Sequence, residues 1–148
     1  MVNYITGDLF TTKADVIAHG VNCRGGFGSG VAGQIAKRYP YARHQYLSKF
    51  NKNGWKLGEV QLVNIFGEGL VIANCATQDN YGGSGLLANY EAIDKCLTYL
   101  EKYCLRLHLT LAIPRIGAGL ANGDWVVIQG IIEKIFTDSP VKIEVYSL

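Results

Sequence analysis

The sequence predicts an α/β protein with three layers, in which helices cover both faces of a central mixed β-sheet. Three observations support this fold class. Short segments rich in apolar and β-branched residues alternate with segments of helical periodicity, which is the order of elements in α/β folds. Two of the apolar segments flank a short glycine turn, which indicates one antiparallel hairpin. The chain has 148 residues, so we expect one compact domain spanning residues 1–148.

The N-terminal half begins with an apolar stretch at residues 2–6, and after a turn-rich segment it continues with VIAHGVN at residues 16–22. The second of these segments is apolar enough to be a strand buried on both faces. After a glycine-rich loop, residues 29–40 carry apolar side chains at helical spacing, and the proline at the end of this segment stops the helix. A second helix is expected from Tyr41 to about Asn53.

The C-terminal half follows the same alternation. The segments EVQLVNIF at 59–66 and LVIANCAT at 70–77 flank a Gly-Glu-Gly turn and predict the antiparallel hairpin. Residues 86–105 have the apolar spacing of an amphipathic helix. The remaining expected elements are a strand from residue 109 that runs into a second glycine turn, a helix at 124–136 and a last strand at 141–147.

The composition excludes several classes of protein. Hydrophobic residues make up 49% of the chain and charged residues 18%, with a mean hydropathy of +0.11, which is typical of a well-folded soluble protein. No apolar segment approaches the roughly 20 residues that span a bilayer, and the first residues lack the features of a signal peptide. We therefore expect a cytoplasmic protein without membrane contact. The net charge of +2 gives no indication of nucleic-acid binding, and nothing points away from a monomer.

The cysteines and the distribution of charge narrow the function further. Four cysteines form no C-x-x-C pair and have no histidines at zinc-ligand spacing, so we expect reduced, buried thiols and no metal site.

The charged residues are unevenly distributed along the chain. No acidic residue lies between Asp15 and Glu59, whereas 7 of the 14 Lys and Arg residues do. This basic segment is either a solvated helical face or a positive field that attracts an anionic ligand.

One stretch, HGVNCRGGFGSGVAGQIAKRYP at residues 19–40, contains the G-x-G-x-x-G pattern of a dinucleotide-binding turn at residues 28–33. Two features argue against that assignment. No acidic residue follows at the distance needed to bind a ribose 2′-hydroxyl, and six residues separate the glycines from the end of the preceding apolar run. A P-loop is excluded because no G-K-[ST] follows.

These glycines can still bind an anion, although the dinucleotide-binding assignment fails. Glycines without Cβ atoms can turn consecutive backbone N–H groups toward an anion, and the helix that starts near Gly30 adds the positive end of its dipole. A second loop of the same kind lies at Gly117 to Gly119. Two such loops on either side of a pyrophosphate would hold it rather than cleave it.

Three motifs in this order resemble the macrodomain family, whose members bind ADP-ribose. They are GDLF at 7–10, HGVN followed by GSGVAGQIA within 19–36, and IPRIGAGLANGDW at 113–125. The resemblance spans nearly the whole chain, from Ile5 to the C-terminal VYSL. It implies a single three-layer macrodomain with ADP-ribose as its ligand.

The resemblance also implies roles for matching residues. Asp8 would accept a hydrogen bond from the adenine amino group, with the Leu9 backbone beside it. Asn22 would bind the distal ribose hydroxyls, and Trp125 would pack on the adenosine. Local alternatives stay open, namely the first turn of a helix or a loop nest for the aspartate, a turn residue for the asparagine and a core residue for the tryptophan. The phosphates would lie between Gly28, Ser29, Gly30 and Val31 on one side and Ile116, Gly117, Ala118, Gly119 and Leu120 on the other.

Within the family, the chain is most similar to the branch that contains the fungal ADP-ribose-1''-phosphate phosphatase. The shared features are His19 in place of the first asparagine of an N-A-A-N signature, the R-Y-P ending of the long motif, and the GGS of NYGGSG. It is also similar to the terminal ADP-ribose protein glycohydrolase branch in PRIG-GL, the tryptophan after it and VYSL. Hydrolases of that branch rely on a lysine and an aspartate, where this chain has Gln78 and Ala121, so a covalent lysine route is not expected.

A phosphatase has to position a water, neutralise charge on the phosphoryl oxygens and protonate the leaving ribose oxygen. His19 is the histidine beside a candidate ligand loop, and its ordinary pKa suits acid–base catalysis. Asp79 is the second catalytic candidate, as general base or as the group that orients His19, and Arg24 is a candidate contact for the terminal phosphate. The alternatives are a core histidine, an exposed turn carboxylate and a solvated arginine.

The sequence therefore predicts a protein that binds ADP-ribose and dephosphorylates ADP-ribose-1''-phosphate, without a cofactor. Its expected partners are these two ligands and ADP-ribosylated proteins. Two alternatives stay open. One is a non-catalytic ADP-ribose binding module, and the other is an ADP-ribosyl-protein hydrolase.

Overall fold

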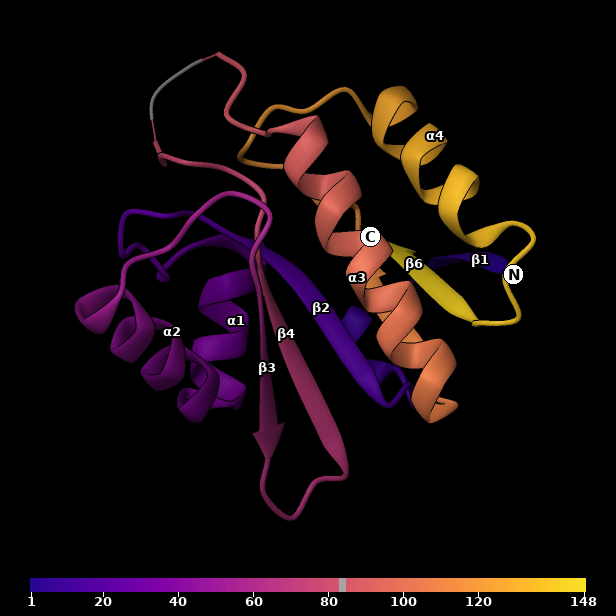
Figure 1. The fold of residues 1–148 in the computed structure, drawn as a ribbon, viewed down its shortest axis with the longest axis horizontal. Coiled ribbons are helices and arrows are strands. Elements are labelled where there is room, and N and C mark those ends of the chain that lie inside the picture. The colour runs from indigo at the N-terminus through magenta and orange to yellow at the C-terminus, as the bar shows by residue number, and fades with distance from the viewer. Residues whose placement is uncertain (83–84) are drawn as a thin grey trace.

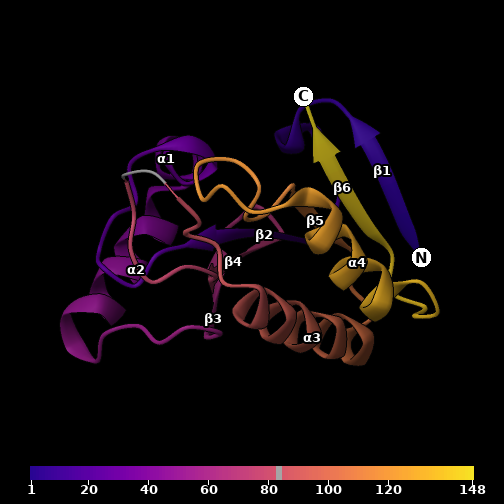
Figure 2. The ribbon, with the colours of Figure 1, turned by 90° about the horizontal axis from the view of Figure 1, so that it is seen from above.

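A computed structural model describes residues 1–82 and 85–148, which form six strands and four α-helices. Figures 1 and 2 show their arrangement. Gly83 and Ser84, which belong to the NYGGSG motif, lie outside the described residues. The strands are β1 (Val2–Thr6), β2 (Val16–Val21), β3 (Val60–Ile65), β4 (Leu70–Ala76), β5 (Leu111–Pro114) and β6 (Ile143–Ser147). The helices are the short 3-10 helix η1 (Leu9–Thr11) and α1 (Gly30–Arg38), α2 (Pro40–Lys52), α3 (Tyr90–Leu107) and α4 (Trp125–Phe136).

The strands form one mixed sheet in the order β1-β6-β5-β2-β4-β3. Every neighbouring pair is parallel except β3 and β4, which form the antiparallel hairpin predicted around the glycine turn. Strand β2 lies between β4 and β5, and its burial on both faces agrees with its unbroken apolar sequence. The mixed sheet expected from the sequence is confirmed.

The helices lie in two layers, one on each face of the sheet (Figures 1 and 2). Helices α3 and α4 pack over one face and bury Ile93, Leu97 and Ile128 against it. Helices α1 and α2 cover the other face, where Ile35 and Tyr46 are fully buried. Each layer of helices buries apolar side chains against the sheet, so the protein has one hydrophobic core on each face of the sheet.

Helix α3 starts four residues later than the sequence predicts, at Tyr90 instead of Leu86. The Asn89 side chain accepts the backbone N–H of Ala92 and so caps the helix. The residues before it are extended, because the N–H groups of Leu87 and Ala88 both donate to the Ala121 carbonyl of another loop. The apolar spacing that suggested a longer helix comes from residues that pack against this loop. The helix also ends two residues later than predicted, at Leu107.

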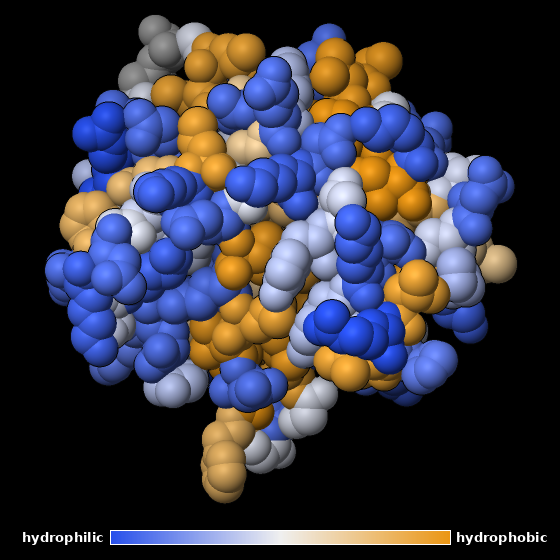
Figure 3. Space-filling view, viewed as in Figure 1, coloured by the Kyte–Doolittle hydropathy of each residue, from blue (hydrophilic) through white to orange (hydrophobic). Residues whose placement is uncertain are grey.

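The outer strands β3 and β4 are only partly covered on the face that carries α3 and α4. Figure 3 shows apolar side chains gathered there beside α3. They include Val60, Leu62 and Val71, which pack against the core but stay partly exposed. The two helices therefore shield the centre of the sheet more completely than its β3 edge.

The four cysteines are free and buried, as the sequence predicts. Two of them, Cys75 and Cys96, lie in the core beneath α3. Within residues 1–82 and 85–148, no helix has the length and apolar character that crossing a membrane requires.

Candidate functional site

The predicted ligand residues gather at one edge of the sheet. Strands β1, β6, β5, β2 and β4 run parallel, so the loops that follow them all leave at the carboxyl edge. With neighbouring strands about 4.8 Å apart, the loop after β1 and the loop after β4 lie roughly 19 Å from each other along this edge. The edge therefore offers an elongated site, with Asp8 near one end and Asp79 near the other.

The centre of this edge is a topological switch point. The chain leaves β2 toward α1 on one face, whereas it leaves β5 toward α4 on the opposite face. Open α/β sheets bind ligands in the crevice outside the sheet at such a point, and we use the word crevice for this place between the two loops. The two glycine loops identified in the sequence occupy these two positions.

The first glycine loop is held by the side chain of Asn22. Its Oδ1 atom accepts the N–H groups of Arg24 and Gly26 at 2.9 and 3.1 Å, and its Nδ2 atom donates to the Gly26 carbonyl at 2.7 Å. The residue is buried. The structure thus gives Asn22 a role in folding the loop, and contact with a ribose stays a prediction.

Two aromatic residues that the sequence analysis did not single out anchor the same loop. The Tyr46 hydroxyl of α2 accepts the Gly25 N–H at 3.1 Å and lies 2.8 Å from the Asn22 carbonyl oxygen, to which it donates. Burial raises the pKa of Tyr46 to about 12, so the hydroxyl keeps its proton at neutral pH. Phe27 packs on Tyr46 with ring centroids 5.0 Å apart. The sequence offered one sign of this anchoring, because Phe27 is the single large apolar residue within the glycine run.

The glycines then lead into α1. Gly25 and Gly30 have φ angles of +86° and +60°, which favour glycine. A Cβ atom at Gly33 would lie 2.9 Å from the Gly28 carbonyl oxygen, so this helix position tolerates only the smallest residue without a shift. Residues 28–30 are exposed, and the first N–H groups of a helix have no partner within it. This geometry suits an anion.

The second glycine loop faces the first. A Cβ atom at Gly30 would lie 3.3 Å from the Leu120 Cδ1 atom, so the two loops touch. Leu120 is 69% exposed although it is apolar, so it lies on the surface where the two loops meet. Gly117 has a φ of +79° and accepts the Gly123 N–H at 2.8 Å, which closes the loop into a tight turn. Ile116 is buried, so only its backbone can reach a ligand.

The end of the site near β1 is built by Asp8 and Leu9. The Asp8 carboxylate accepts the Phe10 N–H at 2.9 Å and caps η1, so Asp8 directly precedes the first turn of this short helix. Its side chain is exposed, so the second carboxylate oxygen is accessible. The Leu9 side chain lies in the core. Contact with an adenine stays a prediction for both residues.

Trp125, the first residue of α4, is partly buried against the core. The Arg115 guanidinium lies over its ring, 4.9 Å from the centroid. The Asp124 side chain caps the helix by accepting the Val126 N–H. The tryptophan therefore contacts both the core and Arg115, and its stacking on an adenosine stays a prediction.

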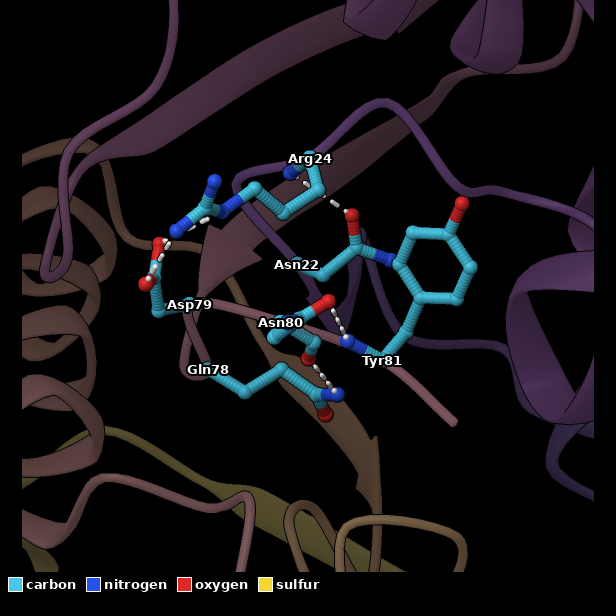
Figure 4. Close-up of polar contacts among 6 residues, drawn as sticks. All are labelled: Asn22, Arg24, Gln78, Asp79, Asn80 and Tyr81. Carbon is cyan, nitrogen blue, oxygen red and sulfur yellow. Dashed lines mark hydrogen bonds and ion pairs between the residues drawn. The ribbon is translucent and has the colours of Figure 1, made fainter. Parts of the chain in front are cut away.

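The far end of the site is formed by the loops that follow β2 and β4 (Figure 4). Arg24 forms two bonds to Asp79, from Nε to Oδ1 at 3.3 Å and from Nη2 to Oδ2 at 3.0 Å. The Cys23 N–H donates to the Asp79 carbonyl oxygen at 2.9 Å, so the two loops are also joined through the backbone. The Gln78 side chain extends away from this pair and donates to the Asn80 carbonyl (Figure 4).

His19, the first catalytic candidate, packs on Phe27 of the first glycine loop but lies in the core rather than at the surface of the site. His19 is in the middle of β2, on the face that α1 and α2 cover, and is 1% exposed. Its Nε2 atom lies 2.6 Å from Oδ1 of Asn74 on β4, and its ring meets Phe27 edge-on at 5.3 Å. Among the described residues, Nδ1 has no partner. Asp79 pairs with Arg24 and does not orient the imidazole.

Burial lowers the pKa of His19 from 6.5 to about 4, while the hydrogen bond to Asn74 opposes this shift. The imidazole is therefore neutral at physiological pH. Because no ring atom reaches the crevice, the position favours the alternative of a core histidine that supports Phe27 and, through it, the first glycine loop.

Ala121, which matches the aspartate of the glycohydrolase branch, is buried, and its carbonyl accepts two backbone N–H groups. No carboxylate therefore stands at this point of the crevice. Within residues 1–82 and 85–148, no three or more His, Cys, Asp or Glu side chains are grouped so that they could hold a metal ion.

Comparison with known proteins agrees with this geometry. The family model described as Macro domain matches residues 18–131, which include both glycine loops and α3. A human protein named ADP-ribose glycohydrolase OARD1 is 30% identical over 151 residues, which cover 99% of this chain and 91% of that protein. A Meyerozyma guilliermondii protein named ADP-ribose 1''-phosphate phosphatase is 31% identical over 163 residues, covering 90% of this chain and 93% of its own.

The fold has solved counterparts as well. The macrodomain of Mycobacterium tuberculosis DarG superimposes with a TM-score of 0.88 and covers 100% of this chain and 98% of its own, at 24% identity. At this identity the likeness bears on the fold alone. It confirms the α/β architecture with helices on both faces of a mixed sheet.

Proposed function

Since this chain belongs to the macrodomain family, we propose that its carboxyl-edge crevice binds ADP-ribose and that the protein is a hydrolase acting on ADP-ribose-1''-phosphate. The observation that carries the binding proposal is the meeting of two glycine loops, at Gly30 and Leu120, across the switch point of the sheet. Exposed backbone N–H groups there suit a diphosphate. In this proposal the macrodomain comprises residues 1–148 and acts as a monomer in the cytoplasm, where its four free thiols stay reduced.

The proposed orientation follows from the length of the edge. With the diphosphate in the central cradle of residues 28–31 and 116–120, the adenosine extends toward Asp8, Leu9 and Trp125. The distal ribose then extends toward Asn22 and the pair of Arg24 and Asp79. An elongated ligand with a base at one end and a sugar at the other fits this order of sites. The names of the relatives, an ADP-ribose glycohydrolase and an ADP-ribose 1''-phosphate phosphatase, support the identity of the ligand.

The hydrolytic step is proposed to use the groups at the distal end. Water attacks phosphorus, the bond from phosphorus to the ribose 1''-oxygen breaks, and the proton lost by the water ends on the departing oxygen. Asp79 would accept the proton from the water, and Arg24 would neutralise phosphoryl charge. His19 is left out of this step because its ring is buried, and a catalytic role for it stays a prediction.

A phosphate-release assay tests the proposal. The protein is incubated with ADP-ribose-1''-phosphate, free phosphate is followed over time, and ADP-ribose affinity is measured by calorimetry. We expect ADP-ribose binding and phosphate release that the Asp79→Asn variant loses. If ADP-ribose binds but no phosphate appears, the phosphatase activity is refuted and the non-catalytic binding module is supported.

The glycohydrolase alternative is favoured by one comparison, the 30% identity to the human ADP-ribose glycohydrolase over nearly the whole chain. Gln78 and Ala121 argue against a lysine-dependent route, so such an activity would use water attack assisted by the substrate. Release of ADP-ribose from an ADP-ribosylated protein, without phosphatase activity, would support this alternative.

A further inference from the structure

The two helical layers of the protein differ in charge. Helices α3 and α4 together carry four basic and four acidic residues. Helices α1 and α2 carry no Asp or Glu but five basic residues, namely Lys37, Arg38, Arg43, Lys49 and Lys52. The net charge of +2 for the whole chain hides this asymmetry. The exposed side of α1 and α2, called the α1–α2 face below, is therefore positively charged.

Most of the basic side chains on the α1–α2 face are available to a partner. Among the described residues, Lys49 is the member of the set that forms an ion pair, with Glu59. The other four are exposed. Figure 3 shows hydrophilic residues gathered over α2. Several positive charges without partners on one surface favour a ligand with several negative charges, that is, a polyanion.

A cavity opens in the same layer at the edge of the sheet opposite the crevice. Its volume is about 400 Å³, and its lining joins the end of α1 and the start of α2 to the turn that follows β3. Because β3 is antiparallel to β4, its last residue, Ile65, pairs with Leu70, the first residue of β4. The cavity therefore lies at the amino edge of the sheet, away from the two glycine loops.

Aromatic side chains form much of the lining of this cavity. Phe66 is fully exposed, Tyr41 is 54% exposed, and Tyr39 lines the cavity with them. Arg38 also contributes, and its guanidinium lies over the Phe10 ring, 4.4 Å from the centroid. Exposed aromatic rings beside an arginine are the groups on which unstacked nucleobases pack.

The combination of charge and aromatic groups fits a single strand of nucleic acid. Its phosphates repeat between bases that can leave the stack, so one ligand supplies groups for both the basic surface and the cavity. The bases of a duplex are stacked and paired, so they would leave the aromatic side chains without a partner. Glu68 also lines the cavity and would repel a phosphate, so a base fits this point better than a phosphate does.

We propose that the α1–α2 face, together with the cavity lined by Tyr41 and Phe66, is a binding surface for single-stranded nucleic acid. One base stacks on the aromatic side chains, and the phosphates beside it contact Lys37, Arg38 and Arg43. This surface lies outside the crevice, and the inference does not rest on the proposed function.

The test measures binding by fluorescence anisotropy. The probes are a labelled single-stranded DNA of about 12 nucleotides and the RNA of the same sequence. We expect the wild type to bind at least one of them, with an affinity that falls as salt is added. Phe66→Ala should weaken this binding about fivefold or more and leave the salt dependence unchanged, because a base loses its stacking partner. Since Phe66 is fully exposed, its removal leaves the core intact.

A second set of variants tests the charges. The double variant Lys37→Gln with Arg43→Gln should weaken binding and reduce the slope of log affinity against log salt by about 1.4, since each phosphate contact on a single strand contributes about 0.7. Glu68→Gln should strengthen binding about twofold, because it removes a negative charge beside the strand.

Matched controls come from the other helical layer. Tyr99 and Lys102 are an exposed aromatic residue and an exposed lysine on α3. Tyr99→Ala and Lys102→Gln should each leave the affinity and its salt dependence unchanged. Circular dichroism of each variant shows that it is folded.

Three outcomes would overturn the inference. The first is that the wild type binds neither single strand, including the case in which it binds vesicles that contain phosphatidylserine instead. The second is that Lys102→Gln weakens binding as much as the double variant does. The third is that a duplex of the same sequence binds as tightly as the single strand and Phe66→Ala has no effect. Calorimetry with ADP-ribose keeps the proposed function separate, because none of these variants should change that affinity.

Discussion

His19 should make the stability of this protein depend on pH between 7 and 5. Its pKa is about 4 in the folded chain, where burial disfavours the charged ring, and close to 6.5 when the chain is unfolded. As the pH falls below 6.5, the unfolded chain takes up a proton at His19 and the folded chain does not. The stabilisation from the neutral ring is therefore complete above pH 6.5 and is lost as the pH falls toward 4. From these two pKa values the loss between pH 7 and pH 5 is about 2 kcal/mol.

The assay is urea unfolding at pH 7 and pH 5 for the wild type and for His19→Gln, whose amide can still donate to Asn74. The other histidines are present in both proteins, so their contributions cancel in the comparison. We expect the wild type to lose about 2 kcal/mol more than the variant. If the variant does not fold, the wild type still provides a test, because the ring protons of His19 should show no titration by NMR from pH 8 to pH 5. Equal pH dependence of the two proteins, or titration of His19 near pH 6.5, would refute the buried neutral ring.

Three further predictions concern the glycine loops and α4. Tyr46→Phe should lower the free energy of unfolding by about 1–3 kcal/mol and weaken ADP-ribose binding, because the loop loses its buried hydrogen bonds; unchanged urea unfolding would contradict this. Gly33→Ala should destabilise the protein, because its methyl group would meet the Gly28 carbonyl at 2.9 Å. The matched control Gly130→Ala, in α4 with open space around it, should stabilise by about 0.5–1 kcal/mol, and equal shifts in thermal unfolding for the two variants would show that close approach is not the constraint. Asp124→Ala should cost about 1 kcal/mol through loss of the cap of α4, and an unchanged unfolding midpoint would show that the cap is dispensable.

Much of the fold could be predicted because its signals are local. The Gly-Glu-Gly turn between two apolar runs specified the hairpin. The stop at Pro40 placed the end of α1 to within two residues and the start of α2 to within one. The start of α3 was misplaced because Leu86 and Leu87 carry the right spacing for a helix but belong to an extended segment. The segment before α3 is held extended by hydrogen bonds from the Leu87 and Ala88 N–H groups to the carbonyl of Ala121, which lies in a distant loop.

The candidate site also combines features that the sequence predicts with features that it does not. The two glycine loops were found from sequence, since a run of glycines before a helix predicts an anion cradle whatever surrounds it. The contribution of Tyr46 was missed, because its hydroxyl reaches the loop only when α2 folds back beside it. The pairing of Arg24 with Asp79, 55 residues later in the chain, likewise needs β2 and β4 to lie side by side.

The sequence by itself determined the order of strands and helices, the two phosphate-type loops and the family, because periodicity, turn residues and motifs are properties of neighbouring positions. Only the tertiary structure decided what His19 does. Its strand is apolar throughout, so no alternation of polar and apolar residues showed which way the ring points. The ring is buried because β2 is a central strand with helices on both faces, and its hydrogen-bond partner, Asn74, comes from the neighbouring strand. Burial and pairing of this kind depend on segments far apart in the chain, and they place a catalytic candidate in the core, where its neutral ring packs on Phe27 of the first glycine loop.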